Sequence, residues 1–297
     1  MWTIERIVHF EPGDFLRDGL THFGFHDRRG RRFGIDHPRH FLGLVGKGGR
    51  VEWTVAAHAV FPGVSNIEAP LSFPMYVDLL RDGSPIVSNF DSAQLFRIDM
   101  RELRAELLVD GHALGMADMG NCVVDRDGFI WVNEVRGSRV WRFHPGGRPA
   151  RTVEGFGWIY DIRIARDGEI FVLDSGNFAL RAIDPDTGAV RTVAEGFASD
   201  PTATFDGPIS LSLDEHGKAY VGDRQAHVVR EVDVAGGAMT TIAGRADVDG
   251  NSNAATLRDP LQLNLPEISS MDYHAGRLYV PTDLDGEHGD LAVLRRI

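Results

Sequence analysis

Short segments in which apolar and polar residues alternate follow one another along most of the chain. The pattern is clearest in three segments: VVDRDGFIWVNEVRGSRVWRFHPGG, RIARDGEIFVLDSGNFALRAIDPDTG and SLDEHGKAYVGDRQAHVVREVDVAGG. In each of them an apolar run leads to a turn with Asp and Gly, and two alternating segments follow with a polar turn between them. Alternation with a period of two, bounded by Gly and Asp, predicts β-strands joined by tight turns.

Six copies of this unit align on a turn glycine, which is Gly30, Gly83, Gly128, Gly168, Gly217 or Gly276. The sixth residue after each glycine is expected to end the second strand. It is acidic or an amide in five copies, Asp36, Asn89, Glu134, Asp174 and Asp223, and it is Thr282 in the last copy. Repeats of roughly 40–50 residues with four short strands each are typical of propeller blades, which bury their faces by stacking against one another.

The sequence therefore predicts a single all-β domain over residues 1–297, a six-bladed β-propeller with four-stranded antiparallel blades. The last copy has only three clear strands, while the opening segment TIERIVHF alternates like a strand without a partner. We expect this N-terminal strand to join the last blade and close the ring. The blades are predicted at residues 11–60, 70–111, 117–155, 158–196, 206–244, and 265–297 together with 1–10.

Composition narrows the functional classes. The chain has 43 acidic and 31 basic residues, a formal net charge of −12, which argues against a nucleic-acid partner. No apolar stretch reaches the roughly 18 residues of a membrane span, and the first residues lack the basic and apolar regions of a signal peptide. The single cysteine, Cys122, excludes an internal disulfide. These features predict a cytoplasmic protein that associates with neither membranes nor nucleic acid.

Two segments resemble the repeats of NHL-type propellers. IFVLDSGNFALRAID is similar to the strand pair of that repeat, and YVGDRQAHVVREVD with MTTIAGRADVDGNSNAATLRDP is similar to a strand pair and its connector. The resemblance extends over roughly residues 119–282 and implies a six-bladed propeller, distantly similar to the gluconolactonase- and strictosidine-synthase-type propellers. Because related propellers include lyases, hydrolases and binding modules, the resemblance leaves the function open.

The carboxylates that end the second strands allow two interpretations. Asp174 and Asp223 stand in turn sequences where an aspartate accepts backbone N–H bonds, which favours a structural role. Glu134 departs from the Asp of the repeat, and its longer side chain is poorly suited to capping a turn. A functional role is therefore as plausible as a structural one for Glu134.

A second set of polar residues stands seven or eight positions before the turn glycines, where the inner strands begin. These positions hold His22, Tyr76, Asn121, Asp161 and Ser210, with Glu267 and Ser269 in the last copy. Carboxylate, amide and imidazole ligands suit a divalent ion such as Ca²⁺, Mg²⁺, Mn²⁺ or Zn²⁺. The resemblance to gluconolactonase-type propellers implies a metal held by Glu, Asn and Asp, although their opening Glu-Gly-Pro is absent here.

We therefore expect a site at the mouth of the propeller channel. The candidate metal ligands are Asn121, Glu134, Asp161, Asp223 and Glu267, and the candidate catalytic residues are Asp161, Glu134, His22 and His37. The candidate substrate-binding residues are Tyr76, Trp158, Tyr160 and His112. No organic cofactor is expected. Because crowded carboxylates repel one another, Asp161→Asn is expected to keep or raise the melting temperature.

Two functions from different classes follow. The first is an intracellular enzyme, a hydrolase or lyase, that acts on a small organic molecule through a divalent metal or through carboxylate and histidine acid–base chemistry. The alternative is a non-catalytic NHL-type interaction module that binds a protein through an aromatic face formed by Phe156, Trp158 and Tyr160.

Overall fold

A computed structural model gives the structure of the chain. It describes residues 1–9, 32–36, 40–45, 51–198, 207–245, 258–263, 265, 268, 271–282 and 290–297. Within these residues the chain forms six four-stranded sheets, and its helices are 3₁₀ turns of three residues each, η1 (His112–Leu114), η2 (Ser175–Asn177) and η4 (Pro260–Gln262). The sheets are the blades of a six-bladed β-propeller, so the predicted fold class is confirmed. None of the helices in the described part has the length and apolar character needed to cross a membrane.

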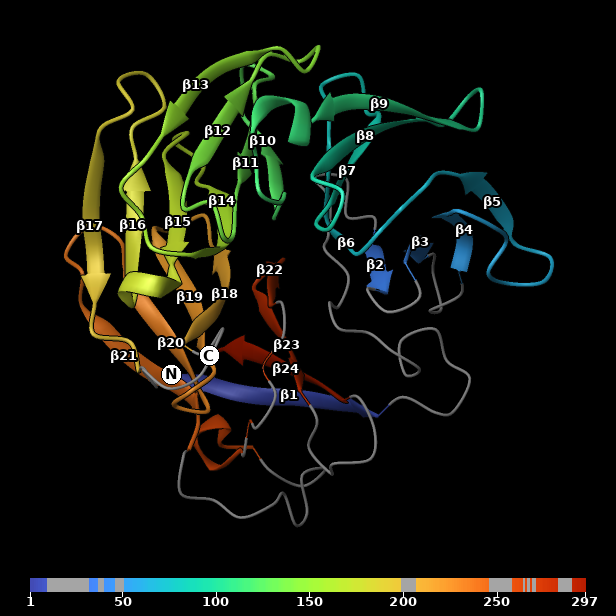
Figure 1. The fold of residues 1–297 in the computed structure, drawn as a ribbon. Coiled ribbons are helices and arrows are strands. Elements are labelled where there is room, and N and C mark those ends of the chain that lie inside the picture. Colours follow the sequence, from blue (N-terminus) through green and yellow to red (C-terminus); the bar gives the residue numbers. More distant parts are fainter. Residues whose placement is uncertain are drawn as a thin grey trace. The chain divides into compact units, whose positions relative to one another are not determined.

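The chain forms two compact units, and residues 19–164 make up one of them. Its first sheet contains β2 (Arg32–Asp36), β3 (Phe41–Val45), β4 (Val51–Ala56) and β5 (Ser65–Glu68). The second contains β6 (Pro74–Leu79), β7 (Pro85–Asn89), β8 (Gln94–Asp99) and β9 (Arg104–Asp110). The third contains β10 (Cys122–Val124), β11 (Ile130–Asn133), β12 (Val140–Phe143) and β13 (Pro149–Val153) (Figure 1). The unit ends with β14 (Ile159–Ile164).

The other unit combines residues 1–18 with residues 165–297. The fourth sheet has the order β14-β15-β16-β17, of which this unit supplies β15 (Ile170–Asp174), β16 (Ala179–Ile183) and β17 (Val190–Glu195). The fifth sheet contains β18 (Pro208–Leu213), β19 (Lys218–Asp223), β20 (Val228–Asp233) and β21 (Met239–Gly244). The last sheet has the order β1-β24-β23-β22, with β1 (Trp2–His9), β22 (Asp272–His274), β23 (Arg277–Thr282) and β24 (Asp290–Arg296).

The predicted register of the repeat matches these strands. The position six residues after the turn glycine ends β2, β7, β15, β19 and β23, and in the third sheet Glu134 follows β11 directly. The hairpin glycines Gly83, Gly128 and Gly168 have positive φ angles of 86°, 87° and 100°, a backbone conformation in which a side chain is strained. The repeat glycine is therefore required by the turn between the first two strands of the unit.

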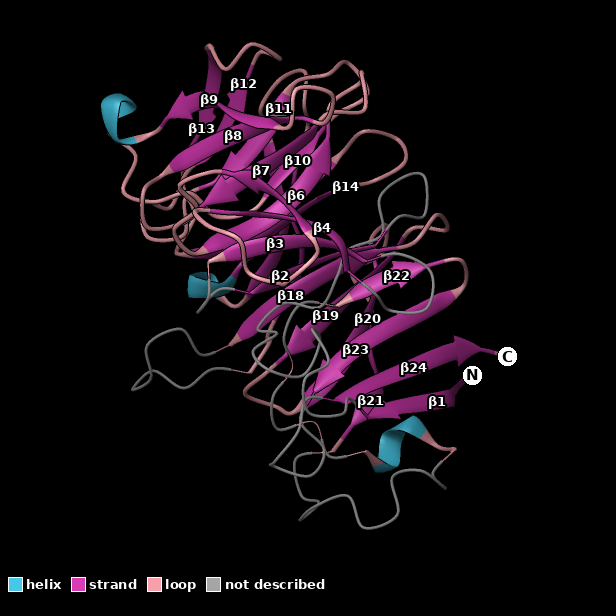
Figure 2. Ribbon diagram, turned by 90° about the vertical axis from the view of Figure 1, so that its right-hand side faces the viewer, coloured by secondary structure: helices cyan, strands magenta, loops and turns pink. Residues whose placement is uncertain are grey.

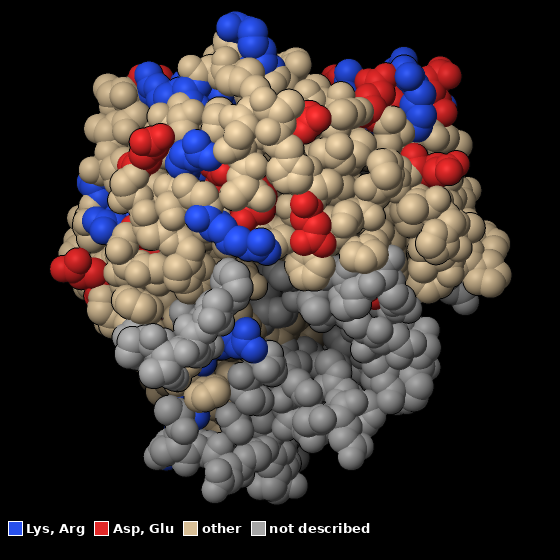
Figure 3. Space-filling model, viewed as in Figure 1, with Lys and Arg blue, Asp and Glu red and all other residues tan. Residues whose placement is uncertain are grey.

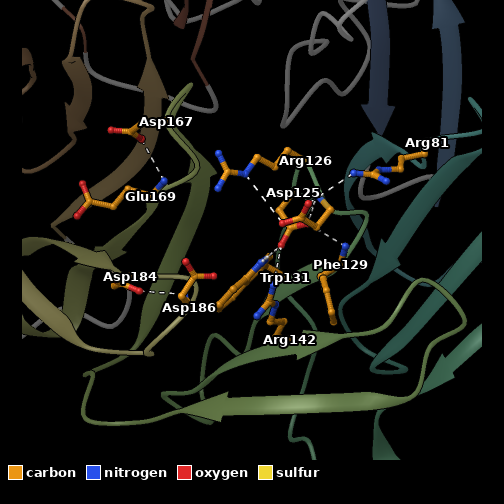
Figure 4. A network of polar contacts seen from close by, with 11 residues as sticks. Arg81, Asp125, Arg126, Phe129, Trp131, Arg142, Asp167, Glu169, Asp184 and Asp186 are labelled. Carbon is orange, nitrogen blue, oxygen red and sulfur yellow. Dashed lines mark hydrogen bonds and ion pairs between the residues drawn. The ribbon is translucent and has the colours of Figure 1, made fainter.

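An aspartate holds the same turn in place. In the third sheet, Asp125 Oδ1 accepts hydrogen bonds from the backbone N–H groups of Asp127 and Phe129, both at 2.9 Å. Its second oxygen accepts from Trp131 Nε1 at 3.0 Å and pairs with Arg142 at 3.3 Å (Figure 4). The carboxylate thus ties the turn to β11 and β12. Such side-chain bonds to a turn backbone explain why the D-x-x-G sequence recurs.

The first sheet differs from the others at its outer edge. Strand β5 pairs with β4 in parallel, with Trp53 opposite Ser65, because the eight residues between the strands carry the chain back to its starting end. Side-chain bonds hold the added strand: Thr54 Oγ1 donates to Asn66 Oδ1 at 2.8 Å, and Asn66 Nδ2 donates to the carbonyl of Ala56 at 3.3 Å. The inner strand predicted for this blade, before Gly30, lies outside the described residues.

Closure of the last blade by the N-terminal strand is confirmed. Strand β1 pairs antiparallel with β24, from Trp2 opposite Arg296 to His9 opposite Asp290, and Figures 1 and 2 show the two strands side by side. The Trp2 side chain is buried, meets the Tyr220 ring edge-on at 5.5 Å between ring centroids, and donates from Nε1 to Glu231 at 2.9 Å. The first strand is therefore anchored by side chains as well as by its backbone ladder.

Candidate functional site

The inner strands of unit 19–164 bring three of the predicted site residues to one place in the repeat. Tyr76 lies in β6, Asn121 directly precedes β10, and Asp161 lies in β14, each seven residues before its turn glycine. All three side chains are buried, with Asp161 only 2% exposed. Buried polar groups require hydrogen-bond partners, so their contacts indicate what the site can do.

Asp161 is the centre of this group. Its Oδ1 accepts a hydrogen bond from Asn121 Nδ2 at 2.6 Å and one from the backbone N–H of Ile162 at 2.8 Å. The same oxygen accepts from Nη1 of Arg163, which forms a buried ion pair with it. The structure therefore brings Asn121 and Asp161 together and adds a cation that the sequence analysis did not select.

A second asparagine, Asn133, positions the strands that carry Asn121 and Asp161. Asn133, at the end of β11, accepts from the backbone N–H of Asn121 at 2.9 Å and donates from Nδ2 to the carbonyl of Ile159 at 2.9 Å. It thereby joins the start of β10 to the start of β14. A Cβ on Gly120 would lie 2.4 Å from Asn133 Nδ2, so only glycine allows this close approach.

Arg163 is held as firmly as the aspartate. Its Nη1 also donates to the carbonyl of Ile162 at 2.8 Å, and its guanidinium carbon lies 4.4 Å from the centre of the Tyr76 ring. That distance is typical of a cation–π contact. One sequence signal could have identified this residue: it stands two positions after Asp161 in an inner strand, so both side chains lie on the same face.

The site also has an unused acceptor. Asn121 Oδ1 is buried and accepts no hydrogen bond from the described residues, whereas its Nδ2 is bound to Asp161. Leaving a buried acceptor without a partner is unfavourable, and a water or a ligand commonly supplies the missing donor. A carboxylate, a guanidinium, a phenol and a buried amide oxygen thus lie within one group of side chains.

Glu134 belongs to a different network. Its Oε1 accepts from the backbone N–H of Ala117 at 2.7 Å, and its Oε2 accepts from Trp141 Nε1 at 2.8 Å. Arg139 binds both oxygens, with Nε at 2.6 Å from Oε2 and Nη2 at 3.0 Å from Oε1. These four donors tie the end of β11 to the preceding loop and to β12. Among the described contacts, none joins Glu134 to Asn121 or Asp161.

Asp174 and Asp223 brace neighbouring strands in the other unit. Asp174 Oδ2 accepts from Arg181 Nε at 3.1 Å, and Asp223 Oδ2 pairs with Arg230 Nε at 3.4 Å, seven residues further along in both cases. Each arginine also donates to a threonine on the next strand, Thr192 or Thr241. Burial raises the pKa of the Asp223 carboxyl above its ordinary value. The repeated geometry favours the structural interpretation of these two carboxylates.

Other candidates lie apart from this group or outside the described residues. Trp158 and Tyr160 are half-buried, and their rings meet edge-on at 5.9 Å between ring centroids. Tyr160 directly precedes Asp161 in β14, so its side chain points to the opposite face of the sheet. His112 is exposed at the start of η1. The remaining three, His22, His37 and Glu267, lie outside the described residues.

Asp118 is a buried carboxylate that the sequence pattern did not indicate. Asp118 accepts from the backbone N–H groups of Val135 at 2.7 Å and Arg136 at 3.1 Å, and its burial raises the pKa of the carboxyl. Its position in the loop before β10 is not shared by the other repeats, so the repeat gave no signal for it. The bonds fix the chain after β11, which places Asp118 among the structural groups.

The described residues around Asp161 do not fit a divalent ion. Asp161 Oδ1 already accepts three hydrogen bonds, and one donor is a guanidinium whose charge would repel a metal cation. Within the described part of the chain, no three His, Cys, Asp or Glu side chains lie close enough together to hold a metal ion. The metal site remains a prediction, and two of its candidate residues, His22 and Glu267, lie outside the described residues.

Charge does not single out another binding surface. On the face shown in Figure 3, acidic and basic side chains are interspersed over the described residues. Elsewhere among the described residues, oppositely charged side chains form exposed ion pairs, such as Arg191 with Glu169 at 2.7 Å and Arg97 with Asp82 at 2.6 Å. Pairs of this exposure contribute little to stability and neutralise the local field.

Comparison with known proteins shows the fold. No family model and no curated protein matches the chain. Virginiamycin B lyase from Staphylococcus aureus superposes with a TM-score of 0.64 and 14% identity, and the match covers 100% of both chains. A gluconolactonase from Xanthomonas campestris superposes with a TM-score of 0.63 and 15% identity, over 97% of this chain and 89% of that chain.

A third similar structure is an auxiliary nutrient binding protein from Bacteroides thetaiotaomicron. Its TM-score is 0.67 at 13% identity, and the match covers 99% of this chain and 76% of that chain. The chain thus shares the propeller fold with a lyase, a gluconolactonase and a nutrient binding protein. Identities this low show a shared fold and leave the chemistry to the residues of each chain.

Proposed function

We propose that the protein is an enzyme that acts on a small organic molecule at the group formed by Tyr76, Asn121, Asp161 and Arg163. The observation that carries the proposal is the buried Asn121–Asp161–Arg163 group, in which Asn121 Oδ1 accepts no hydrogen bond from the described residues. Buried carboxylates and guanidinium groups are costly to maintain, and such clusters concentrate at functional sites.

In this proposal each residue has a stated role. Asp161 accepts a proton from the substrate or from an attacking water, and Arg163 stabilises the negative charge that develops on a substrate oxygen. Asn121 receives a hydrogen bond from the substrate at its buried Oδ1, and Tyr76 supports the guanidinium from beneath. A base next to a fixed positive charge suits hydrolysis or elimination, and the structural similarity to a lyase and a gluconolactonase supports this choice.

The proposal is tested by assaying the purified protein against esters, lactones and cyclic peptide lactones, with products identified by mass spectrometry. Turnover by the wild type and its loss in Asp161→Asn are expected. Asp186→Asn, the same substitution at an exposed hairpin tip, should retain full activity. Equal turnover by wild type and Asp161→Asn would contradict the assignment of the site.

A binding protein without catalysis is the second candidate, supported by the similarity to a nutrient binding protein. It predicts that a small molecule raises the melting temperature without being converted, and that the gain disappears in Asp161→Asn. An NHL-type module would instead bind a protein and leave the buried group unused. The cytoplasmic location and the absence of a nucleic-acid partner stay predictions.

A further inference from the structure

The buried ion pair at the proposed site has a definite arrangement of charge. Asp161 Oδ1 faces the guanidinium of Arg163, and the two side chains are 3% and 10% exposed. Asn121 approaches the same oxygen through its amide nitrogen, so its Oδ1 is left as the buried acceptor. Oxygen atoms from an asparagine and an aspartate on adjacent inner strands are a donor set for a hard cation. In this chain the guanidinium of Arg163 provides the positive charge next to the aspartate.

Arg163 is built into this position. Its guanidinium is fixed by Asp161, by the carbonyl of Ile162 at 2.8 Å and by the face of the Tyr76 ring at 4.4 Å. Three contacts of different kinds, on a side chain that is largely buried, oppose its displacement. A metal ion bound to Asp161 would have to share the aspartate with a positive charge that is held in place.

We propose that Arg163 replaces a divalent cation at this site, so that Asp161 and Asn121 work without a metal bound to them. The inference rests on the proposed function for the location of the site. Its consequence is a latent metal site. Replacing the guanidinium with a neutral amide removes the positive charge of Arg163 from beside the Asp161 carboxylate, and Arg163→Gln adds an amide oxygen to the group. With few protein ligands, the dissociation constant for Ca²⁺ should be on the order of 10⁻⁴–10⁻³ M.

Five proteins test the proposal: wild type, Asp161→Asn, Arg163→Gln, Arg163→Lys and the double variant Arg163→Gln/Asp161→Asn. Each is treated with EDTA, dialysed and titrated with Ca²⁺ and with Mn²⁺. Binding is followed by the melting temperature and by the loss of the free Mn²⁺ signal in electron paramagnetic resonance. These readouts require no substrate. Circular dichroism establishes that each variant is folded before titration.

The wild type and Arg163→Lys, which keep the positive charge, are expected to show no metal-dependent shift. Arg163→Gln should bind Mn²⁺ and gain about 3 °C in melting temperature at about 10 mM Ca²⁺. The double variant should lose this gain because it lacks the carboxylate. Metal binding by the wild type that Asp161→Asn abolishes would overturn the proposal, as would a folded Arg163→Gln that binds no metal. If Arg163→Gln does not fold, the wild-type titration tests the proposal: metal binding that depends on Asp161 overturns it, and the absence of metal binding supports it.

The result is separable from the proposed function. If no substrate is found but Arg163→Gln gains a metal, the assignment of Arg163 stands and the enzyme proposal fails. If the wild type turns over a substrate only after metal is restored, and its metal binding depends on Asp161, the enzyme proposal stands and the replacement of the metal by Arg163 is wrong.

Discussion

Replacing Asp161 with asparagine is expected to destabilise the protein by about 3 kcal/mol. The ion pair with Arg163 is buried, with side-chain exposures of 3% and 10%. Breaking a buried pair by removing one charge typically costs about 3–5 kcal/mol, because the remaining charge has lost its counter-charge. Asparagine has the shape of aspartate and leaves no cavity. Its Oδ1 still accepts from Asn121 and Ile162, so the cost should fall at the lower end of this range.

Because the unfolding entropy grows with chain length, this loss corresponds to a melting temperature lower by roughly 5 °C. Thermal unfolding followed by circular dichroism and the guanidinium midpoint followed by tryptophan fluorescence both measure it. Asp186→Asn should change stability by less than about 0.5 kcal/mol. The double variant Asp161→Asn/Arg163→Gln should recover part of the loss, with a coupling energy of at least about 1.5 kcal/mol.

A melting temperature of Asp161→Asn equal to or above that of the wild type would refute this reasoning. That result is the one expected from the sequence, on the argument that crowded carboxylates repel one another. The structure reverses the sign because the group nearest to Asp161 Oδ1 is a cation. The measurement therefore distinguishes a carboxylate cluster from an ion pair at the same residue.

Three further predictions follow from closure and burial. Trp2→Ala should lower the unfolding free energy by about 3–4 kcal/mol because the indole is buried against Tyr220. The control Thr3→Ala should lower it by less than about 1 kcal/mol. Equal effects of the two substitutions in guanidinium unfolding would contradict the anchoring role of Trp2. Deleting residues 1–9 exposes the edge of β24, so size-exclusion chromatography should show dimers or aggregates; an unchanged monomer would argue against closure by this strand. Burial raises the pKa of the Asp223 carboxyl in the folded state, so its protonated form contributes stability below the ordinary pKa of 3.8, and this stability is lost as the pH rises through the folded pKa. Because asparagine does not titrate, the melting temperature of Asp223→Asn should rise relative to that of the wild type from about pH 4 to about pH 7. A difference that stays constant with pH would refute this linkage.

The sequence predicts the fold well because both features of its repeat, the alternation of the strands and the turn glycine, reflect local structure. Alternation marks strands with one face towards each neighbour, and a glycine with positive φ marks each hairpin. The parallel pairing of β5 was not predictable in this way, since it depends on where an eight-residue connection carries the chain. Side-chain bonds from Asn66 then stabilise that pairing, and no periodicity records them.

The candidate site was predictable in part. Equal register in neighbouring repeats placed Asn121 beside Asp161, and the structure joins them at 2.6 Å. Arg163 was not predicted because the repeat aligns one position across the blades, whereas the ion pair joins two positions in one strand. Glu134 was selected for its length, yet that length lets it reach Arg139 and Trp141. Which partners a carboxylate finds is a tertiary property, and residue type alone does not determine it.

Pairing β1 with β24 also determines when folding can finish. The backbone N–H of Ile297 donates to the carbonyl of Met1 at 3.0 Å, so the two ends of the chain meet in one ladder. During synthesis at roughly 5–20 residues per second, the first strand waits on the order of 15–60 s for its partner. Contacts of such long sequence separation slow folding, because the intervening chain must be ordered first. In this interval the alternating segment of β1 is an unpaired strand edge, and its exposure makes the nascent chain a substrate for chaperones.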